Sequence, residues 1–294
     1  MYDVIIIIMF KLLFSLLFVV GFYKDSVISC YGDVIIYMFL ISLIFLIFIM
    51  LSVSFFSLLE RKKLASIQNR KGPNNVGVIG VLQPFSDGIK LVSKGVVIPL
   101  KADGFLFVCM SFLGFVLGVV SISFIPFNYR SVICDVNLGV FFVLLFSIFH
   151  VYSIMLAGWS SKSSYSFLAS LRSSAQLIAY DISVSLILLN LVLNVRSLNF
   201  LKLVEYQHYN GWFLFFYFHL FLLFVVCSLA ETNRHPFDLV EAESELVSGY
   251  NVEYSSMYFG LLFLGEYSSV LFMSLFIVIL FFGGYSSFFV FFFY

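Results

Sequence analysis

The sequence has little charge and few cysteines, and each scarcity excludes a class of protein. Charged residues make up 11% of its 294 residues and sum to a formal net charge of zero, which gives no indication of a nucleic-acid partner. Iron–sulfur and zinc sites need clustered thiolates. The four cysteines are scattered without a Cys-x-x-Cys pair, so we expect no metal site (Cys30, Cys109, Cys134, Cys227). No phosphate-binding glycine loop, Walker pattern or serine elbow occurs either.

Apolar residues, in contrast, dominate the chain. They make up 62% of it, the aromatic fraction is 20% and the mean hydropathy is +1.08, whereas apolar residues form roughly half of an ordinary soluble chain. Continuous apolar runs long enough to cross a bilayer recur throughout, and they do not alternate as barrel strands do. We therefore predict an all-α, polytopic membrane protein that forms a single membrane domain over residues 1–294. About seven spans are expected, at 4–22, 34–58, 104–126, 136–157, 176–195, 212–230 and 256–284.

The first of these segments is ambiguous, because Lys11 lies inside it. It is either a signal-like segment or an extra N-terminal span, and the sequence shows no small-residue cleavage site after it. We therefore interpret 4–22 as an extra, uncleaved helix ahead of a core at 34–284.

The basic residues fall mainly in alternate loops. One set of loops holds eleven of them (Arg61, Lys62, Lys63, Arg70, Lys71, Lys90, Lys94, Lys101, Lys162, Arg172, Arg234). The other set holds four (Lys24, Arg130, Arg196, Lys202). The positive-inside rule then predicts that 59–103, 158–175 and 231–255 lie on the inner face of the membrane.

The first inner loop contains a pattern typical of an amphipathic helix. Over 81–94 the apolar residues Leu82, Phe85, Ile89 and Val92 share one face, while Asp87, Lys90 and Lys94 lie elsewhere. One interpretation is a helix lying in the headgroup region, with its lysines on lipid phosphates. The other is a wall of an entrance between the membrane and an aqueous domain.

The third inner loop gathers acidic residues. The stretch AETNRHPFDLVEAESELVSGYNVEY, residues 230–254, holds six carboxylates and a single arginine, Arg234 (Glu231, Asp238, Glu241, Glu243, Glu245, Glu253). Carboxylates that share a semi-buried space raise one another's pKa and titrate as a group. The stretch is therefore either an ordinary solvated loop or a cluster that exchanges protons.

Two more acids lie within predicted spans. Asp181 is close to the inner end of its helix, and Glu266 is about ten residues, or roughly 15 Å, from the end of its own. An acid at mid-bilayer costs roughly 2.5–3.5 kcal/mol on insertion scales, so it usually faces protein and has a function. Elsewhere, Gly114 and Gly118 form a small-xxx-small pattern that predicts close helix packing.

Three long stretches together make the sequence recognisable. They are LERKKLASIQNRKGPNNVGVIGVLQPFSDGIKL, GWSSKSSYSFLASLRSSAQLIAYD and the acidic stretch quoted above. In this order they closely resemble the signature stretches of the chain 1 family of proton-pumping NADH–ubiquinone oxidoreductase, respiratory complex I. The resemblance runs from about residue 40 to 284.

The resemblance implies a role in a larger assembly. The chain would form the heel of the membrane arm, wall the ubiquinone tunnel, and couple quinone reduction to proton translocation. Ubiquinone would be the substrate, while NADH, FMN and iron–sulfur clusters would be bound by partner subunits. Those partners would include the quinone-site hydrophilic subunits and adjacent small membrane subunits, with lipids around them. The AT-rich-type composition and the lack of a presequence further indicate an organelle-encoded, multi-pass protein of the mitochondrial inner membrane, with its basic and acidic loops facing the matrix.

The resemblance also implies site residues. The proton-coupling candidates are Glu231, Asp238, Glu241, Glu243, Glu245, Glu253, Glu266 and Asp181. The candidates for the quinone tunnel or its entrance are Arg61, Arg70, Phe237 and Asp87. The sequence departs from the family pattern at Gly95 and Asp181, where glutamate is usual, and at Ala242 and Gly265, where one small residue replaces another. The change at Gly95 puts any role for an acid there in doubt.

Two other function classes compete with this interpretation. One is the heel subunit of a related membrane hydrogenase or antiporter-type complex, and the other is a stand-alone ion transporter. The lack of an inverted second copy of the motifs weakens the transporter hypothesis, and a nickel–iron neighbour would support the hydrogenase. We also expect a separate polypeptide to supply two further spans that family members carry after the Gly265–Tyr267 helix.

Overall fold

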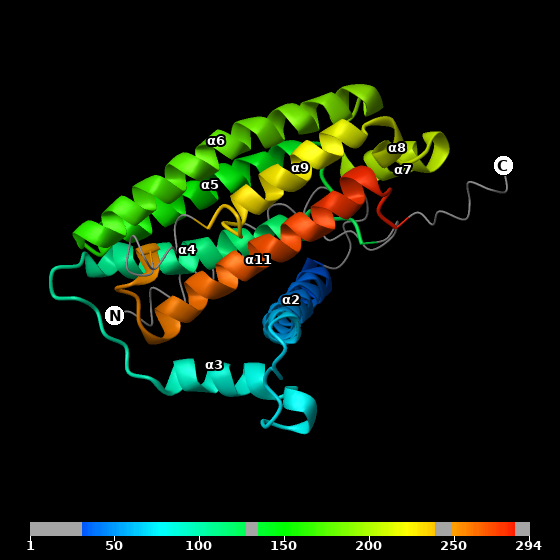
Figure 1. The fold of residues 1–294 in the computed structure, drawn as a ribbon. Helices are drawn as coiled ribbons and strands as arrows, with labels where there is room; N and C mark the ends of the chain where they lie inside the picture. The colour runs from blue at the N-terminus through cyan, green and yellow to red at the C-terminus, as the bar shows by residue number, and fades with distance from the viewer. Residues whose placement is uncertain (1–30, 128–134, 239–248, 286–294) are drawn as a thin grey trace.

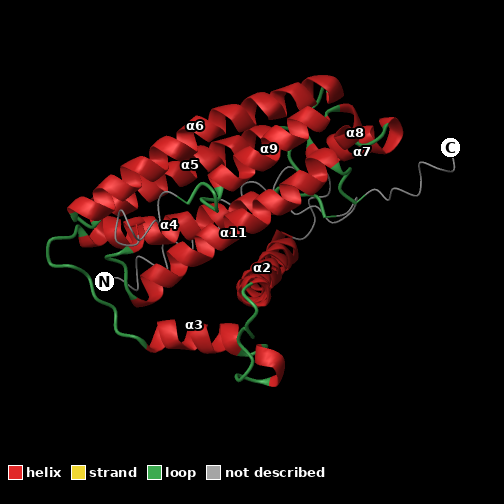
Figure 2. Cartoon of the chain, in the orientation of Figure 1, coloured by secondary structure: helices red, strands yellow, loops and turns green. Residues whose placement is uncertain are grey.

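The computed structural model describes residues 31–127, 135–238 and 249–285, and every regular element in these ranges is helical (Figures 1 and 2). The α-helices are α2 (Tyr31–Ile67), α3 (Gln83–Ser93), α4 (Gly104–Ser123), α5 (Gly139–Ser160), α6 (Ser164–Val195), α7 (Phe200–Asn210), α8 (Phe213–Phe216), α9 (Phe218–Glu231) and α11 (Ser256–Phe281). Two short 3-10 helices, η1 (Val78–Gly80) and η2 (Gly249–Asn251), lie in the loops.

Five helices are long and apolar enough to cross a bilayer. They are the Ser42–Ile67 part of α2 together with α4, α5, α6 and α11, and α9 is a shorter apolar helix. Helices satisfy their own backbone polar groups, which hydrocarbon cannot do. The prediction of an all-α polytopic membrane protein is therefore confirmed. The predicted span 4–22 lies outside the described residues.

The crossing of α4 and α11 is built on glycine. A Cβ on Gly118 would lie 3.0 Å from the backbone oxygen of Gly265, and a Cβ on Gly265 would lie 3.1 Å from the backbone oxygen of Gly114. The two backbones thus approach more closely than side chains would permit, as small residues allow in membrane helices. This confirms the packing predicted from the Gly114–Gly118 pattern, and α11 lies along α4 in Figure 1.

The α5–α6 hairpin corrects one predicted boundary. We expected an inner loop at 158–175 and a helix from 176, but α6 begins at Ser164. Its first turns are rich in serine, so hydropathy misses them. The hydroxyls of Ser170, Ser173 and Ser174 bond the carbonyls three residues earlier and thus need no water. The Ser163 side chain caps the helix by accepting from the Ser166 amide.

Two further differences lie at the other end of the bundle. The predicted span 212–230 is interrupted at Tyr217, whose φ of −126° and ψ of 45° separate α8 from α9. The helix α7, capped by the Asn199 side chain, was not predicted because it is amphipathic and short. Its Gln207 amide donates to the carbonyl of Ile279, 2.9 Å away, and so ties α7 to α11.

The predicted amphipathic helix is present as α3, which lies beside the bundle and below α2 in Figure 1. Leu82, Phe85, Ile89 and Val92 are all exposed. The C-terminal end of α3 is fastened to the start of α11, where the Ser256 hydroxyl contacts the backbone oxygens of Leu91 and Lys94 at 3.0 and 2.6 Å. An exposed apolar face of this kind suits a helix at a lipid or protein boundary.

Candidate functional site

The acidic stretch begins inside the bundle. Its first residues leave α9 beside α6, where the Gln176 side-chain amide lies 3.0 Å from the Ala230 carbonyl and 3.1 Å from the Phe237 carbonyl. Gln176 is twelve positions into α6, or about 18 Å along its axis at the usual rise. The Phe237 ring packs edge-on against the ring of Tyr180, one helical turn further on, with centroids 5.4 Å apart.

The acidic stretch also ends inside the bundle. The Tyr250 hydroxyl donates to the Glu266 carboxylate, and the Asn251 side-chain amide lies 3.4 Å from the same oxygen. Glu266 is ten positions into α11, about 15 Å from its start. Tyr250 and Asn251 are buried, with exposed fractions of 2% and 8%. At both described ends, therefore, the stretch is packed against helices.

Tyr254 anchors the end of the acidic stretch. Its ring stacks on Phe107 of α4 at a centroid distance of 4.0 Å, and its hydroxyl lies 3.1 Å from the Ala157 carbonyl and 3.2 Å from the Ser160 hydroxyl. Burial raises the pKa of Tyr254 to about 12, against a smaller lowering by the Ser160 hydrogen bond. The phenol therefore stays neutral and able to donate. Its ring belongs to a small buried cluster with Leu177 and Leu262.

Asp181 of α6 and Glu231 at the end of α9 lie on two helices that pack against each other. One carboxylate oxygen of Glu231 is buried without a hydrogen-bond partner among the described residues, and so is one of Asp238. A buried carboxylate oxygen without a partner is costly, so we expect these acids to be sites of interest for proton exchange.

Arg234, the arginine of the acidic stretch, contacts two helices outside that stretch. Its guanidinium donates to Glu60 of α2, with Nη1 and Oε1 2.6 Å apart, and lies over the Tyr267 ring of α11 at 4.7 Å from the centroid. The Tyr267 hydroxyl donates to the other Glu60 oxygen at 2.8 Å. We call Glu60, Arg234 and Tyr267 the clamp. Sequence reasoning missed it, although Glu60 stands in the first quoted motif beside Arg61.

The candidate quinone residues do not form one group. Arg61 pairs with Asp87 of α3, with Nη1 and Oδ2 2.7 Å apart, and Gln83 donates to the other Asp87 oxygen at 2.9 Å. Arg70 lies beyond the end of α2, exposed, and bonds Gln68. Phe237 belongs to the α6 side of the acidic stretch. The structure thus brings Arg61 and Asp87 together and leaves Arg70 apart.

The remaining candidates are less informative. Glu253 is half-buried near the start of α11. Glu241, Glu243 and Glu245 lie outside the described residues. Within the described residues no group of histidine, cysteine, aspartate or glutamate side chains is arranged to hold a metal ion.

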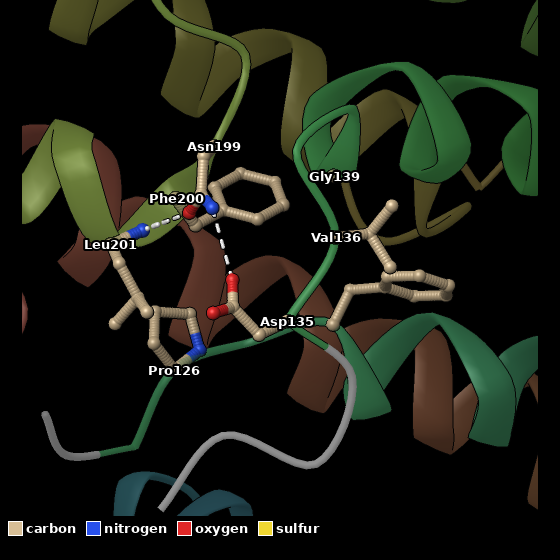
Figure 3. A pocket seen from close by; sticks show the side chains of 8 residues that line it. Pro126, Asp135, Val136, Gly139, Asn199, Phe200 and Leu201 are labelled. Carbon is tan, nitrogen blue, oxygen red and sulfur yellow. Dashed lines mark hydrogen bonds between the residues drawn. The ribbon is translucent and has the colours of Figure 1, made fainter. Parts of the chain in front are cut away.

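A pocket lies where α4 ends and where α5 and α7 begin (Figure 3). Asn199 donates to Asp135 across 2.9 Å and accepts from the Leu201 amide at 2.8 Å, so both of its polar groups are used in holding the start of α7. Phe124, Pro126 and Phe200 also line it. The side chains of Asn199 and Asp135 in this pocket thus already bond one another.

Comparison with known proteins identifies the family of the chain. The family model described as NADH dehydrogenase matches residues 40–294. The chain belongs to the NADH dehydrogenase family. It is 48% identical over 224 residues to NADH-ubiquinone oxidoreductase chain 1 of Chondrus crispus, which covers 76% of this chain and 68% of that relative. It is 43% identical over 257 residues to the same chain of Cyanidium caldarium, covering 87% and 74% of the two proteins.

A third relative is similar to the same extent. This NADH-quinone oxidoreductase component of Paramagnetospirillum magneticum is 47% identical over 224 residues, covering 76% of this chain and 65% of that relative. The resemblance inferred from the three motifs is therefore confirmed. As a member of the NADH dehydrogenase family, the chain is a multi-pass membrane subunit of an oxidoreductase complex.

Proposed function

We propose that the chain walls the ubiquinone tunnel of complex I and couples quinone reduction to proton translocation. It would do so in the mitochondrial inner membrane, with ubiquinone as substrate and the redox centres in partner subunits. The observation that carries the proposal is that the acidic stretch enters the bundle at both ends, beside Asp181 at one end and Glu266 at the other.

The chemistry follows from this placement. Charge that develops on a reduced quinone favours proton uptake by nearby acids, because an added negative charge makes each carboxylate harder to keep ionised. Asp181 and Glu231 lie on two helices that pack against each other, so a change of charge at one would alter the proton occupancy of the other. Glu266, held by a tyrosine hydroxyl and an asparagine amide, would be the next acceptor toward α11.

The proposed quinone wall lies at the junction of α2 and α3. Arg61 remains about half exposed while it pairs with Asp87, so its guanidinium can also meet a polar headgroup. The apolar face of α3 and the nearby Phe55–Phe85 ring pair, with centroids 6.1 Å apart, suit a hydrophobic tail. A cationic side chain and an apolar surface at the same helix junction would suit a substrate with a polar headgroup and a hydrophobic tail.

The test replaces Glu266 or Glu231 by glutamine in the assembled enzyme in sealed membrane vesicles. Each change keeps the side-chain shape and removes the titrating group, so we expect proton translocation per quinone reduced to fall while NADH oxidation with an artificial acceptor persists. Glu205→Gln in α7 is the matched control, since Glu205 is also half-buried but lies far from the acidic stretch. Unchanged translocation in both variants would refute the proposal, and equal loss of both activities would indicate failed assembly instead.

A further inference from the structure

We propose that the clamp of Glu60, Arg234 and Tyr267 is a positioning device that transmits changes at the quinone wall to the proton-carrying acids. The proposal rests on the function proposed above and assigns that coupling to three residues. None of the three is itself a proposed proton carrier or quinone contact. Each, however, is joined to one of these groups through the backbone.

The clamp connects three parts of the fold. Glu60 precedes Arg61 in α2, so the same helical turn carries a clamp residue and the proposed quinone contact. Tyr267 follows Glu266 in α11, so a shift of one moves the other. Arg234 comes from the first turn of the acidic stretch. One glutamate side chain therefore links the α2 wall, the acidic stretch and the α11 acid.

The geometry of the clamp is specific for these side chains. The two oxygens of Glu60 have different partners, Arg234 at 2.6 Å and the Tyr267 hydroxyl at 2.8 Å, so the carboxylate is fixed in both position and rotation. The planar guanidinium also covers the Tyr267 ring, an arrangement that a lysine ammonium reproduces less well. The Phe56 ring packs edge-on against Tyr267 at 6.0 Å, one helical turn before Glu60, and holds the two helices in register.

The turn that carries Arg234 is held from two sides. The Arg234 backbone oxygen accepts from the Phe237 amide at 2.8 Å, which closes the turn, and the Gln176 amide of α6 bonds the same turn at Ala230 and Phe237. The clamp pulls the turn toward α2 and α11, whereas Gln176 holds it to α6. A turn fixed in this way sets the position of Glu231, three residues before Arg234, relative to Asp181.

The side chains of the clamp are partly buried. The side chains of Arg234 and Glu60 are 33% and 27% exposed. At this exposure a charge-assisted hydrogen bond is stronger than a surface ion pair and still able to rearrange. We therefore expect weakening it to alter coupling before it alters folding.

The experiment compares Glu60→Gln, Tyr267→Phe and the double variant in the assembled enzyme in sealed vesicles. Glu60→Gln keeps an acceptor for Tyr267 but removes the charge that holds Arg234, and Tyr267→Phe keeps the ring under Arg234 but removes the hydroxyl. We expect each to lower the protons moved per quinone by roughly twofold or more. We expect the KM for quinone to rise by on the order of tenfold, the loss expected for one hydrogen bond to a charged group. Quinone turnover at saturation should remain.

The double variant and the controls separate positioning from simple damage. Because the three residues act as a unit, the double variant should be no worse than the poorer single variant. Glu205→Gln and Tyr206→Phe in α7 make the same chemical changes away from the clamp and should leave all three readouts unchanged. Additive losses in the double variant, or a proton yield that stays at the normal value in both single variants, would overturn the proposal.

The same vesicles distinguish this failure from failure of the underlying function. If Glu266→Gln lowers the proton yield and the clamp variants do not, the acids couple quinone to protons without the clamp. If Glu266→Gln and Glu231→Gln are both without effect, the proposed function itself is wrong. Assembly is checked for every variant by the activity with the artificial acceptor.

Discussion

Replacing Gly118 by alanine tests the α4–α11 crossing directly. The new Cβ would overlap the Ser268 hydroxyl oxygen and would lie 3.0 Å from the backbone oxygen of Gly265. The serine can rotate away, at the loss of its 2.7 Å hydrogen bond to Gly265, but the backbone oxygen moves only if the helices separate. Overpacking of this kind costs about 1–3 kcal/mol, and alanine returns up to about 1 kcal/mol of helix propensity. We expect a net destabilisation of about 1–2 kcal/mol.

Gly114 provides the matched control on the same helix, one turn earlier. A Cβ there would lie 3.4 Å from the Ser153 hydroxyl and 3.8 Å from Leu262, which are ordinary contacts. Gly114→Ala should therefore be neutral or slightly stabilising. The assay measures the temperature at which the purified complex in detergent denatures irreversibly. The yield of assembled complex is measured in parallel. Adding Ser268→Ala to Gly118→Ala should recover part of the loss. Equal tolerance of Gly118→Ala and Gly114→Ala would refute the close backbone approach.

Two further substitutions test the anchors of the acidic stretch. Tyr254→Phe keeps the stacking on Phe107 but removes the hydroxyl contacts to Ala157 and Ser160. It should lower stability by about 1 kcal/mol. In a time course, protease should then cut between α9 and α11 sooner than in the unaltered complex. Gln176→Met keeps the side-chain volume and removes the amide that bonds Ala230 and Phe237. The loss should cost about 1–3 kcal/mol and expose the start of the acidic stretch to the same protease. Cleavage at the normal rate would show that Gln176 does not hold the turn.

Hydropathy predicted the long helices because each is a continuous apolar run, and it failed where polarity or interruption hid a helix. The first turns of α6 are helical although rich in serine, since their hydroxyls bond backbone carbonyls within the helix. The break at Tyr217 carries no proline or glycine, so no local residue indicated it. The amphipathic α3 was predicted correctly because a 3.6-residue period survives on a short surface helix.

For the candidate site, the sequence indicated the acidic residues but not the residues that contact them. Asp181 and Glu266 stand out as acids within apolar spans, so both could be named from the cost of an acid in a bilayer, whereas Glu231 was named as part of the acidic stretch. Their partners could not be named in this way. Glu60 and Tyr267 are 207 positions apart, and Gln176 and Phe237 are 61 apart, so only the tertiary fold brings each pair together. An arginine within an acidic stretch has acids on both sides of it in the sequence, yet one carboxylate that Arg234 binds belongs to α2.

The choice of neutral anchors at both ends of the acidic stretch has a physical reason. Gln176 holds one end, while Tyr250 and Asn251 meet Glu266 at the other. A lysine or arginine in any of these places would hold a nearby carboxylate ionised and prevent it from taking up a proton. Amides and phenols give directional hydrogen bonds without adding charge, so they fix the acids in space and leave them able to titrate. The clamp places the guanidinium of Arg234 on Glu60. The proposed function therefore predicts a division between charged positioning at the clamp and neutral hydrogen bonding at the acids.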